Sequence, residues 1–302
     1  MYETLTYEVD GRIARITLNR PERGNGITLS TPRELAACVE RANLDPAVHV
    51  IALSGRGKGF CGGYDLVASA EEGFAAWPGG EVASGSPIDP AVQARNHDPS
   101  RPWDPMIDYA MMTRNVRGFM SLFYSDKPVV CKVHGFCVAG GTDMALCADL
   151  LVIEDNAKIG YPPARVWGVP TTMVWVHRIG VERAKRLLFT GDCLSGTEAV
   201  AWGLAIECAP RAELDARFET LLARIARMPV SQLMMMKLAV NQTVLQAGLA
   251  TTQILGTVFD GVSRHTEEGY EFQRRAMEAG FRTAVRERDE PFGDAGPSTF
   301  KG

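Results

Sequence analysis

Two glycine pairs, Gly62-Gly63 and Gly140-Gly141, each lie shortly after a run of apolar residues. Glycine is used where the backbone needs a positive φ or where another group must approach the main chain closely. A glycine pair often marks only a tight turn. The exposed backbone N–H groups of two such turns could, however, bind one carbonyl oxygen and stabilise negative charge that develops on it. The sequence therefore suggests an oxyanion hole, with two simple turns as the alternative.

The second glycine pair is followed by a segment with helical spacing that contains Asp143. The N-terminus of a helix carries partial positive charge, which favours a developing oxyanion. A carboxylate one turn into that helix could act as a general acid or base on a carbonyl compound bound there. The alternative is that Asp143 only caps its own helix, because aspartate is favoured in N-terminal turns.

Short β-rich runs at residues 13–18, 48–53, 129–133 and 150–154 must position these turns. Helical segments separate the runs, and the sequence Ser-Thr-Pro at 30–32 is a typical helix start, with a hydroxyl cap and a proline in the first turn. Strands that alternate with helices imply crossover connections. The pattern predicts an α/β core.

Two other segments of the chain have different sequence patterns. From about residue 181 onward the pattern is helical, with few strand candidates. Residues 77–105 are rich in Pro, Gly, Ser and Asp without a sustained period, which indicates a functional lid or a disordered insertion. The ionisable side chains of this insertion are Glu81, Asp89, His97, Asp98 and Asp104. We interpret them as solvated loop groups and not as catalytic ones; the alternative is that His97-Asp98 lies over a pocket and supplies an acid or base.

Composition excludes several classes of protein. The 302 residues carry 32 Lys and Arg against 36 Asp and Glu, a net charge of −4, with no basic block for nucleic-acid binding. No apolar run is long enough to span a bilayer, and the N-terminus lacks a signal-peptide pattern, so we expect a soluble, cytoplasmic protein with no membrane partner. The seven cysteines include no CxxC pair, which favours reduced thiols and no metal site.

Four motifs in order give the chain a family resemblance. They are ITLNRPERGNGIT from residue 16, GKGFCGGYDL from 57, KPVVCKVHGFCVAGGTDMALCADL from 127 and TGDCLSGTEAVAWGLA from 190. Together they strongly resemble the enoyl-CoA hydratase/isomerase (crotonase) family. The resemblance implies a crotonase-like α/β spiral of ββα repeats over residues 1–195, holding the CoA site and the oxyanion hole. It also implies a C-terminal helical region over residues 196–302 that assembles homotrimers or dimers of trimers.

The same resemblance implies a site for an acyl-CoA thioester. The backbone N–H groups of Tyr64 and Gly140 match the two oxyanion-hole donors of the family, and the glycines before Tyr64 would let the thioester oxygen reach its N–H. Asp143 matches the first of two catalytic glutamates. Coenzyme A would enter as part of the substrate, with no permanently bound cofactor and no metal ion.

Further residues match or adjoin positions that the family places beside CoA or the acyl chain. Lys58 is expected beside CoA, although it could equally be a solvated charge, and Arg23 is a weaker candidate. Arg165 could bind a second carboxylate of the substrate and Trp167 could pack on a ring, whereas the alternatives are a salt bridge and a core tryptophan. The full set of expected substrate- or CoA-binding residues is Arg23, Lys58, Gly62, Gly63, Asp65, Gly141, Arg165 and Trp167.

One position departs from the family pattern. Hydratases of the family carry a second glutamate two residues after the place of Tyr161, and this chain has Pro163 there. Proline cannot ionise, so the two-glutamate mechanism cannot operate unchanged. We expect an enzyme that acts on an enoyl-CoA through an oxyanion-stabilised enolate, nominally an enoyl-CoA hydratase. The alternatives are an isomerase, a hydrolase or lyase, and a non-catalytic acyl-CoA-binding protein.

Overall fold

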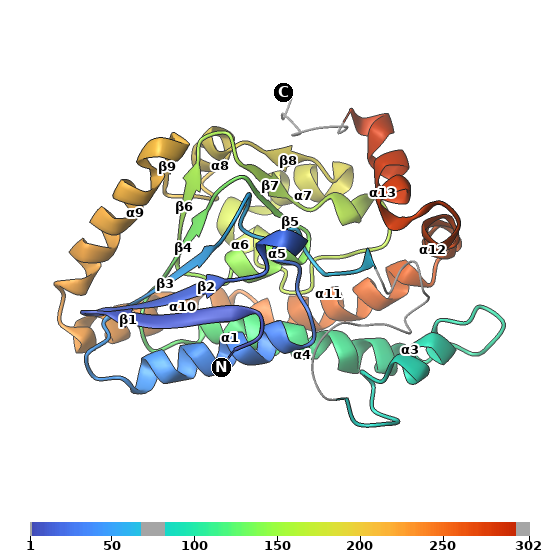
Figure 1. Cartoon of the computed structure of the whole chain (residues 1–302), viewed down its shortest axis with the longest axis horizontal. Helices are drawn as coiled ribbons and strands as arrows, with labels where there is room; N and C mark the ends of the chain where they lie inside the picture. The colour runs from blue at the N-terminus through green and yellow to red at the C-terminus, as the bar shows by residue number, and fades with distance from the viewer. Residues whose placement is uncertain (1, 68–81, 294–302) are drawn as a thin grey trace.

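The computed structural model describes residues 2–67 and 82–293 and contains a six-stranded sheet (Figure 1). The strand order is β1-β2-β3-β4-β6-β9, and β1 is antiparallel to β2 while the later neighbours are parallel. The strands are β1 (Leu5–Asp10), β2 (Ile13–Leu18), β3 (Val50–Gly55), β4 (Val129–Val133), β6 (Leu150–Glu154) and β9 (Glu207–Ala209). The predicted α/β class is confirmed.

A smaller sheet of three strands, in the order β5-β7-β8, accompanies the large one. Its strands are β5 (Phe136–Val138), β7 (Lys158–Gly160) and β8 (Cys193–Leu194). Successive strands step between the sheets, because β4 lies in the large sheet, β5 in the small one, and β6 and β7 repeat that order. This is the spiral of ββα repeats that the sequence resemblance implied, and the strands β5 and β7 of the small sheet end beside residues of the site.

The central strand β3 is buried on both faces, as expected for a parallel strand covered on both sides. Ile51 and Leu53 point into the main core, which includes residues of α1 and α4. Val50 and Ala52 point to the opposite face, which α9 covers. The bounds of these helices are α1 (Ser30–Leu44), α4 (Pro105–Phe123) and α9 (Arg211–Ala226).

The other helices form a C-terminal layer and several short connections. They are α3 (Pro90–Asn96), α5 (Gly140–Ala145), α6 (Trp175–Ile179), α7 (Val181–Thr190), α8 (Gly196–Ala201), α10 (Val230–Gln246), α11 (Leu249–Arg264), α12 (Glu267–Ala279) and α13 (Phe281–Asp289), with 3-10 turns at Pro21–Arg23, Pro162–Arg165 and Glu290–Phe292. In Figure 1, α12 and α13 extend beyond the sheet on the side away from α9. Within the described ranges, no helix is long and apolar enough to cross a bilayer.

The elements expected from the sequence are found, with two differences. The helix begins at Ser30 as its capping pattern predicts, and the four β-rich runs form β2, β3, β4 and β6. The elements expected from the sequence did not include the edge strand β1 or the short strands, and β9 pairs with β6 beyond residue 195, so the sheet continues into the segment expected to be helical. A strand of three residues is too short to show an alternating pattern.

The described part of the insertion, residues 82–105, is folded against the C-terminal helices. Asp89 and Asp104 accept hydrogen bonds from the first turns of α3 and α4, and Asp98 bonds Ser100. His97 is buried and lies 4.6 Å, centre to centre, from the ring of His265. Residues 77–81, including Glu81, lie outside the described residues. Asp89, Asp98 and Asp104 are therefore capping or surface groups, whereas His97 belongs to a packed interface.

Asp65 anchors the first glycine turn to the loop that follows β2. Its carboxylate accepts hydrogen bonds from Arg20 at 2.8 Å and Arg23 at 2.7 Å, and only 5% of its side chain is exposed. Arg20 also donates to the carbonyl of Gly26 at 2.7 Å. Burial raises the pKa of Asp65, but the two arginines outweigh burial and hold this pKa below its usual value. The ionised carboxylate therefore stabilises the loop that positions Tyr64.

We expect Asp65→Asn to lower the free energy of unfolding near pH 7 by about 2 kcal/mol, because both guanidinium groups lose their charged partner. A depressed pKa stabilises the fold above the unfolded-state value of about 4 and loses this effect at lower pH. The difference in the free energy of unfolding between wild type and variant, measured by urea unfolding, should therefore be smaller near pH 3 than near pH 7. The control Asp10→Asn removes an ion pair whose carboxylate is 74% exposed, and should change little. An equal loss in both variants would contradict the anchoring role.

Candidate active site

The two glycine turns that stand far apart in the sequence meet in space. The N–H of Phe60 donates to the carbonyl of Phe136 at 2.9 Å, and the N–H of Val138 donates to the carbonyl of Cys61 at 3.0 Å. Gly63 has a φ of +99°, and a Cβ there would lie 2.8 Å from the Cβ of Ala139. Only glycine fits this position, because the second turn packs directly against the first.

Among the described residues at this junction, the backbone N–H groups of Tyr64 and Gly140 are unpaired, as are those of the adjacent Gly63 and Gly141. By contrast, the flanking N–H groups of Asp65 and Ala139 are both bonded. Gly140 is the first residue of α5, and Ala139 before it has an unusual φ of 53° with ψ of −131°. Such strained backbone is typical of functional sites. Free N–H groups at a helix N-terminus can hold a developing oxyanion.

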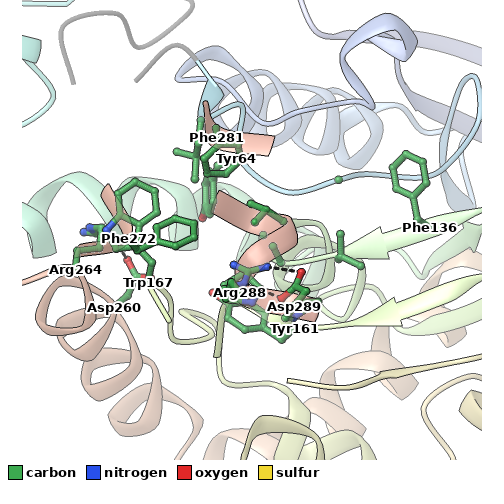
Figure 2. Close-up of a pocket in the computed structure, with 18 of the residues that line it drawn as sticks. Tyr64, Phe136, Tyr161, Trp167, Asp260, Arg264, Phe272, Phe281, Arg288 and Asp289 are labelled. Atoms are coloured by element: carbon green, nitrogen blue, oxygen red, sulfur yellow. Dashed lines mark hydrogen bonds and ion pairs between the residues drawn. The ribbon is translucent and has the colours of Figure 1, made fainter. Parts of the chain in front are cut away.

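A cavity of about 320 Å³ opens beside these donors (Figure 2). It is lined by Gly62, Tyr64, Leu66, Met111, Met112, Phe136, Val138, Ala139, Gly140, Lys158, Tyr161, Pro162, Pro163, Trp167, Asp260, Arg264, Phe272, Phe281, Val285, Arg288 and Asp289. Most of these side chains are apolar or aromatic, as in sites that bury a hydrophobic ligand. The C-terminal helices α11, α12 and α13 all contribute, so the last quarter of the chain closes the site of its own subunit.

Asp143 lies in α5, as predicted, but it does not line the cavity. It is fully buried, and its Oδ1 accepts hydrogen bonds from the backbone and hydroxyl of Thr172 at 3.1 Å and 2.8 Å. Its Oδ2 has no partner among the described residues. Burial raises the pKa of Asp143 to about 7, against the hydrogen bonds from Thr172 and Thr171. It is thus a carboxyl group that is partly protonated at neutral pH, set one layer behind the cavity wall.

The segment at 161–168 places Trp167 and Pro163 on the cavity wall, but not Arg165. Trp167 has a φ of +78°, strained for a bulky residue, and its ring centre lies 5.3 Å from that of Phe272. Arg165 instead bonds Asp289 at 3.0 Å and Asp192 at 3.4 Å, with 2% of its side chain exposed. The structure therefore places Arg165 in the salt-bridge network that the sequence left open as the alternative to substrate binding.

Of the other residues expected at the CoA or acyl site, only Gly62 lines the cavity. Lys58 is exposed outside it, and Arg23 pairs with Asp65. Gly141 allows close packing instead, because a Cβ there would lie 2.6 Å from the carbonyl oxygen of Cys61. Gly63, Asp65 and Gly141 therefore shape the turns that present the two donors and do not face a ligand themselves.

The cavity also contains charged residues that the sequence did not place there. Asp260 and Arg264 lie one turn apart on α11, and Arg288 and Asp289 lie at the end of α13. Figure 2 shows Asp260 and Arg264 beside Trp167 and Phe272, away from Arg288 and Asp289. Arg264 and Asp289 also pair with residues far away in the sequence, Asp108 and Arg165, and no sequence motif indicates these contacts. Among the described residues, no group of His, Cys, Asp and Glu is arranged to bind a metal ion.

Comparison with known proteins agrees with this architecture. The family model described as enoyl-CoA hydratase/isomerase matches residues 8–84 and 105–275, which leaves the segment 85–104 unmatched. A crystal structure of an enoyl-CoA hydratase from Mycobacterium smegmatis is 56% identical, with a TM-score of 0.92, and the match covers 99% of this chain and 98% of that one.

Curated relatives are more distant. The protein EchA13 of Mycobacterium tuberculosis is 31% identical over 80% of this chain and 75% of its own length. The (E)-benzylidenesuccinyl-CoA hydratase of Thauera aromatica is 26% identical over 87% of this chain and 92% of its own length. The family model spans both glycine turns and the strands of both sheets from within β1 onward, and it ends within α12. The chain belongs to the enoyl-CoA hydratase/isomerase family, and is a crotonase-family enzyme.

Proposed function

We propose that this enzyme acts on an enoyl-CoA thioester through an enolate, with hydration of the double bond as its nominal reaction. The observation that carries the proposal is the pair of unpartnered N–H groups, of Tyr64 and Gly140, at an apolar cavity. A thioester oxygen held by both donors becomes more polarised, and negative charge on it is stabilised when a nucleophile adds at Cβ. Each such donor is worth about 3 to 4 kcal/mol in the transition state. The names of the relatives support the same reaction.

We propose that Asp143 transfers the proton at Cα. It follows Gly140 by one turn, and its pKa of about 7 keeps a protonated fraction available at neutral pH. Direct contact with the substrate requires a change in the wall of the cavity, since Asp143 lies behind it. Pro163 favours isomerisation as the second candidate, because one carboxyl group can move a proton between Cα and Cγ without holding a water molecule.

The CoA part of the substrate is proposed to lie outside the cavity, near the exposed Lys58, with Arg23 as a weaker candidate. Coenzyme A leaves with the product, and the proposed reaction needs no resident cofactor. The seven cysteines are all free thiols, which supports a cytoplasmic enzyme. We also propose that the chain divides at residue 195 and that residues 196–302 provide the surfaces through which subunits assemble.

Assembly into trimers, or dimers of trimers, is proposed through the outer faces of α10 and α11. These helices expose an unusual number of large apolar side chains, which are Met235, Met236, Leu238, Val240, Ile254, Leu255 and Phe259. An apolar face of this kind is typical of a subunit interface. Burying it in an oligomer would also fix α11, which carries Asp260 and Arg264.

We expect Gly63→Ala to lower kcat by about a hundredfold or more, because an added Cβ would push against Ala139 and displace both donors. Gly203→Ala is the matched control, since its φ of +80° imposes the same backbone strain with no atom within 4 Å of the added Cβ. Steady-state kinetics with crotonyl-CoA measure the effect. A Gly63→Ala enzyme with the kcat of the Gly203→Ala enzyme would refute the oxyanion-hole assignment.

We expect Asp143→Asn to lower kcat by about 10² to 10⁴. As an acid, Asp143 must be protonated, so wild-type kcat should fall as the pH rises through about 7. Its raised pKa means that ionisation destabilises the fold, a cost that grows between the unfolded-state pKa of about 4 and the folded value. Asparagine cannot ionise, and the variant should therefore be the more stable protein above pH 7.

The Asp143→Asn experiment follows products from both crotonyl-CoA and a 3-enoyl-CoA, with urea unfolding of the same samples near pH 8. A 3-hydroxyacyl product indicates hydration, and a shifted double bond indicates isomerisation. Undiminished turnover in the variant would remove Asp143 from the mechanism. Tight binding of both thioesters without any turnover by the wild type would favour a non-catalytic acyl-CoA-binding protein.

Sedimentation equilibrium should give a mass of three or six times the 32.9 kDa of one chain. Leu238→Glu places a charge on the apolar face of α10, where a leucine is 65% exposed in the single chain, and should dissociate the assembly. Met277→Glu on α12, where the side chain is 55% exposed, is the control and should leave the mass unchanged. A wild-type mass of one chain would contradict the proposed assembly.

A further inference from the structure

Three charged side chains form a buried group at the α11 end of the cavity. Arg264 donates to Asp108 at 2.9 Å and also to Asp260, one turn earlier on α11. Each of the three side chains is at most 8% exposed. Two carboxylates share one guanidinium, so the group carries a net negative charge when both are ionised. A buried charge destabilises the fold unless it is paired. The second carboxylate of this group, which has no guanidinium of its own, therefore requires an explanation.

The two carboxylates differ in their surroundings. Asp108 accepts hydrogen bonds from Trp103 at 2.7 Å, Asn96 at 2.9 Å and Arg264, and it does not line the cavity. Within the described parts of the chain, Asp260 has only the bond from Arg264 and a long one of 3.4 Å from the N–H of Val169, and it lines the cavity. Asp108 is therefore a fixed ionic partner, whereas Asp260 keeps unused acceptor capacity beside the ligand space.

The inserted segment supplies most of the support for this group. Asn96 ends α3, Trp103 precedes α4, and the rings of Trp103 and His265 stack with centres 4.4 Å apart. The segment 85–104, which the family model does not match, includes both Asn96 and Trp103. The inserted segment thus fixes Asp108 through hydrogen bonds. Asp108 fixes Arg264, and Arg264 orients Asp260.

Electrostatics support a close relation between Asp260 and the proposed reaction centre. Burial raises the pKa of Asp260, while its pairing with Arg264 opposes the rise. The charge of Asp260 contributes to the raised pKa values of Asp143, Tyr64 and Tyr161, so all three lie within its electrostatic reach. A perturbed carboxyl group with a specific charged partner, set in a cleft, is typical of acid–base residues.

We propose that Asp260 is the second proton-transfer residue of this enzyme, in place of the carboxylate that Pro163 cannot supply, and that the inserted segment positions it. The inference rests on the proposed enoyl-CoA function. It assigns the hydration of the double bond to a carboxylate on a C-terminal helix. In this proposal, the inserted segment serves to position Asp260 and not to cover the cavity.

In the proposed step, Asp260 takes one proton from a water molecule as the water oxygen forms a bond to Cβ. The electron pair of the Cα–Cβ double bond moves to form the enolate, whose oxygen is held by the N–H groups of Tyr64 and Gly140. Asp143 gives its proton to Cα as the enolate collapses to the thioester. Asp260 then releases its proton to solvent and Asp143 takes one up, so the net change is the addition of one water molecule.

The test compares wild type with Asp260→Asn in two assays. The first follows hydration of crotonyl-CoA, and the second follows exchange of the α-hydrogens of butyryl-CoA in D₂O, which needs the oxyanion hole and Asp143 but no water addition. Asparagine leaves the Arg264–Asp108 pair balanced, so the variant is expected to fold. Asp98→Asn, in the exposed part of the same insertion, is the control for both assays.

We expect Asp260→Asn to lose about a hundredfold or more of its hydration kcat and to keep its α-hydrogen exchange. Wild-type hydration should rise with pH as Asp260 ionises, and this limb should vanish in the variant. The titratable or charged groups near Asp260 are Arg264, Asp108, His97, His265, Tyr64, Tyr161 and Asp143. All of them remain in the variant, so a limb caused by any of them would persist there.

Each other outcome overturns the inference. Hydration by Asp260→Asn at the wild-type rate would remove Asp260 from the mechanism and leave the proposed function intact. Parallel loss of hydration, exchange and thermal stability would make the residue structural. A wild type that neither hydrates crotonyl-CoA nor exchanges the α-hydrogens of butyryl-CoA would refute the proposed function, and the role of Asp260 with it.

Discussion

The backbone N–H groups of Tyr64 and Gly140, which find no acceptor in the part of the chain that the structure describes, are the constraint around which this molecule is arranged. A buried amide donor is costly to leave unpaired, so the fold must hold the donors of Tyr64 and Gly140 in place by other means. β3 of the large sheet leads into the first turn, and β5 of the small sheet leads into the second and pairs with Cys61 of the first. Asp65 fastens the first turn through two arginines. In the proposed complex, the thioester oxygen of the ligand accepts the hydrogen bonds of these two N–H groups.

The buried charged residues in and around the cavity follow a second rule, which is that a buried ion must have a fixed partner. Arg165 meets Asp289 and Asp192, and Arg264 meets Asp108 and Asp260. Asp143 instead has only neutral hydrogen-bond donors, and burial shifts its pKa towards neutrality. The same apolar enclosure therefore keeps some carboxyl groups ionised and leaves another able to hold a proton.

Much of this arrangement could be predicted from the sequence because it depends on local features. Glycine pairs after apolar runs, the cap at Ser30 and Asp143 beyond the second pair are all readable within a few residues. The group of Asp260, Arg264 and Asp108 is not, because Asp108 lies 156 residues from Arg264 and no spacing rule links them. Arg165 is a different case. Its position in the segment beside the cavity could be predicted, but the direction in which its side chain points could not.

The oxyanion donors belong to the main chain, and this separates what can vary in evolution from what cannot. No exchange of one side chain for another deletes a backbone N–H, except for proline, provided that the turns keep their shape. The residues that decide which bond is made or broken, such as Pro163 and the carboxyl groups, can therefore be replaced one at a time while support for the enolate persists. A scaffold of this kind can acquire a new reaction without first losing the old intermediate.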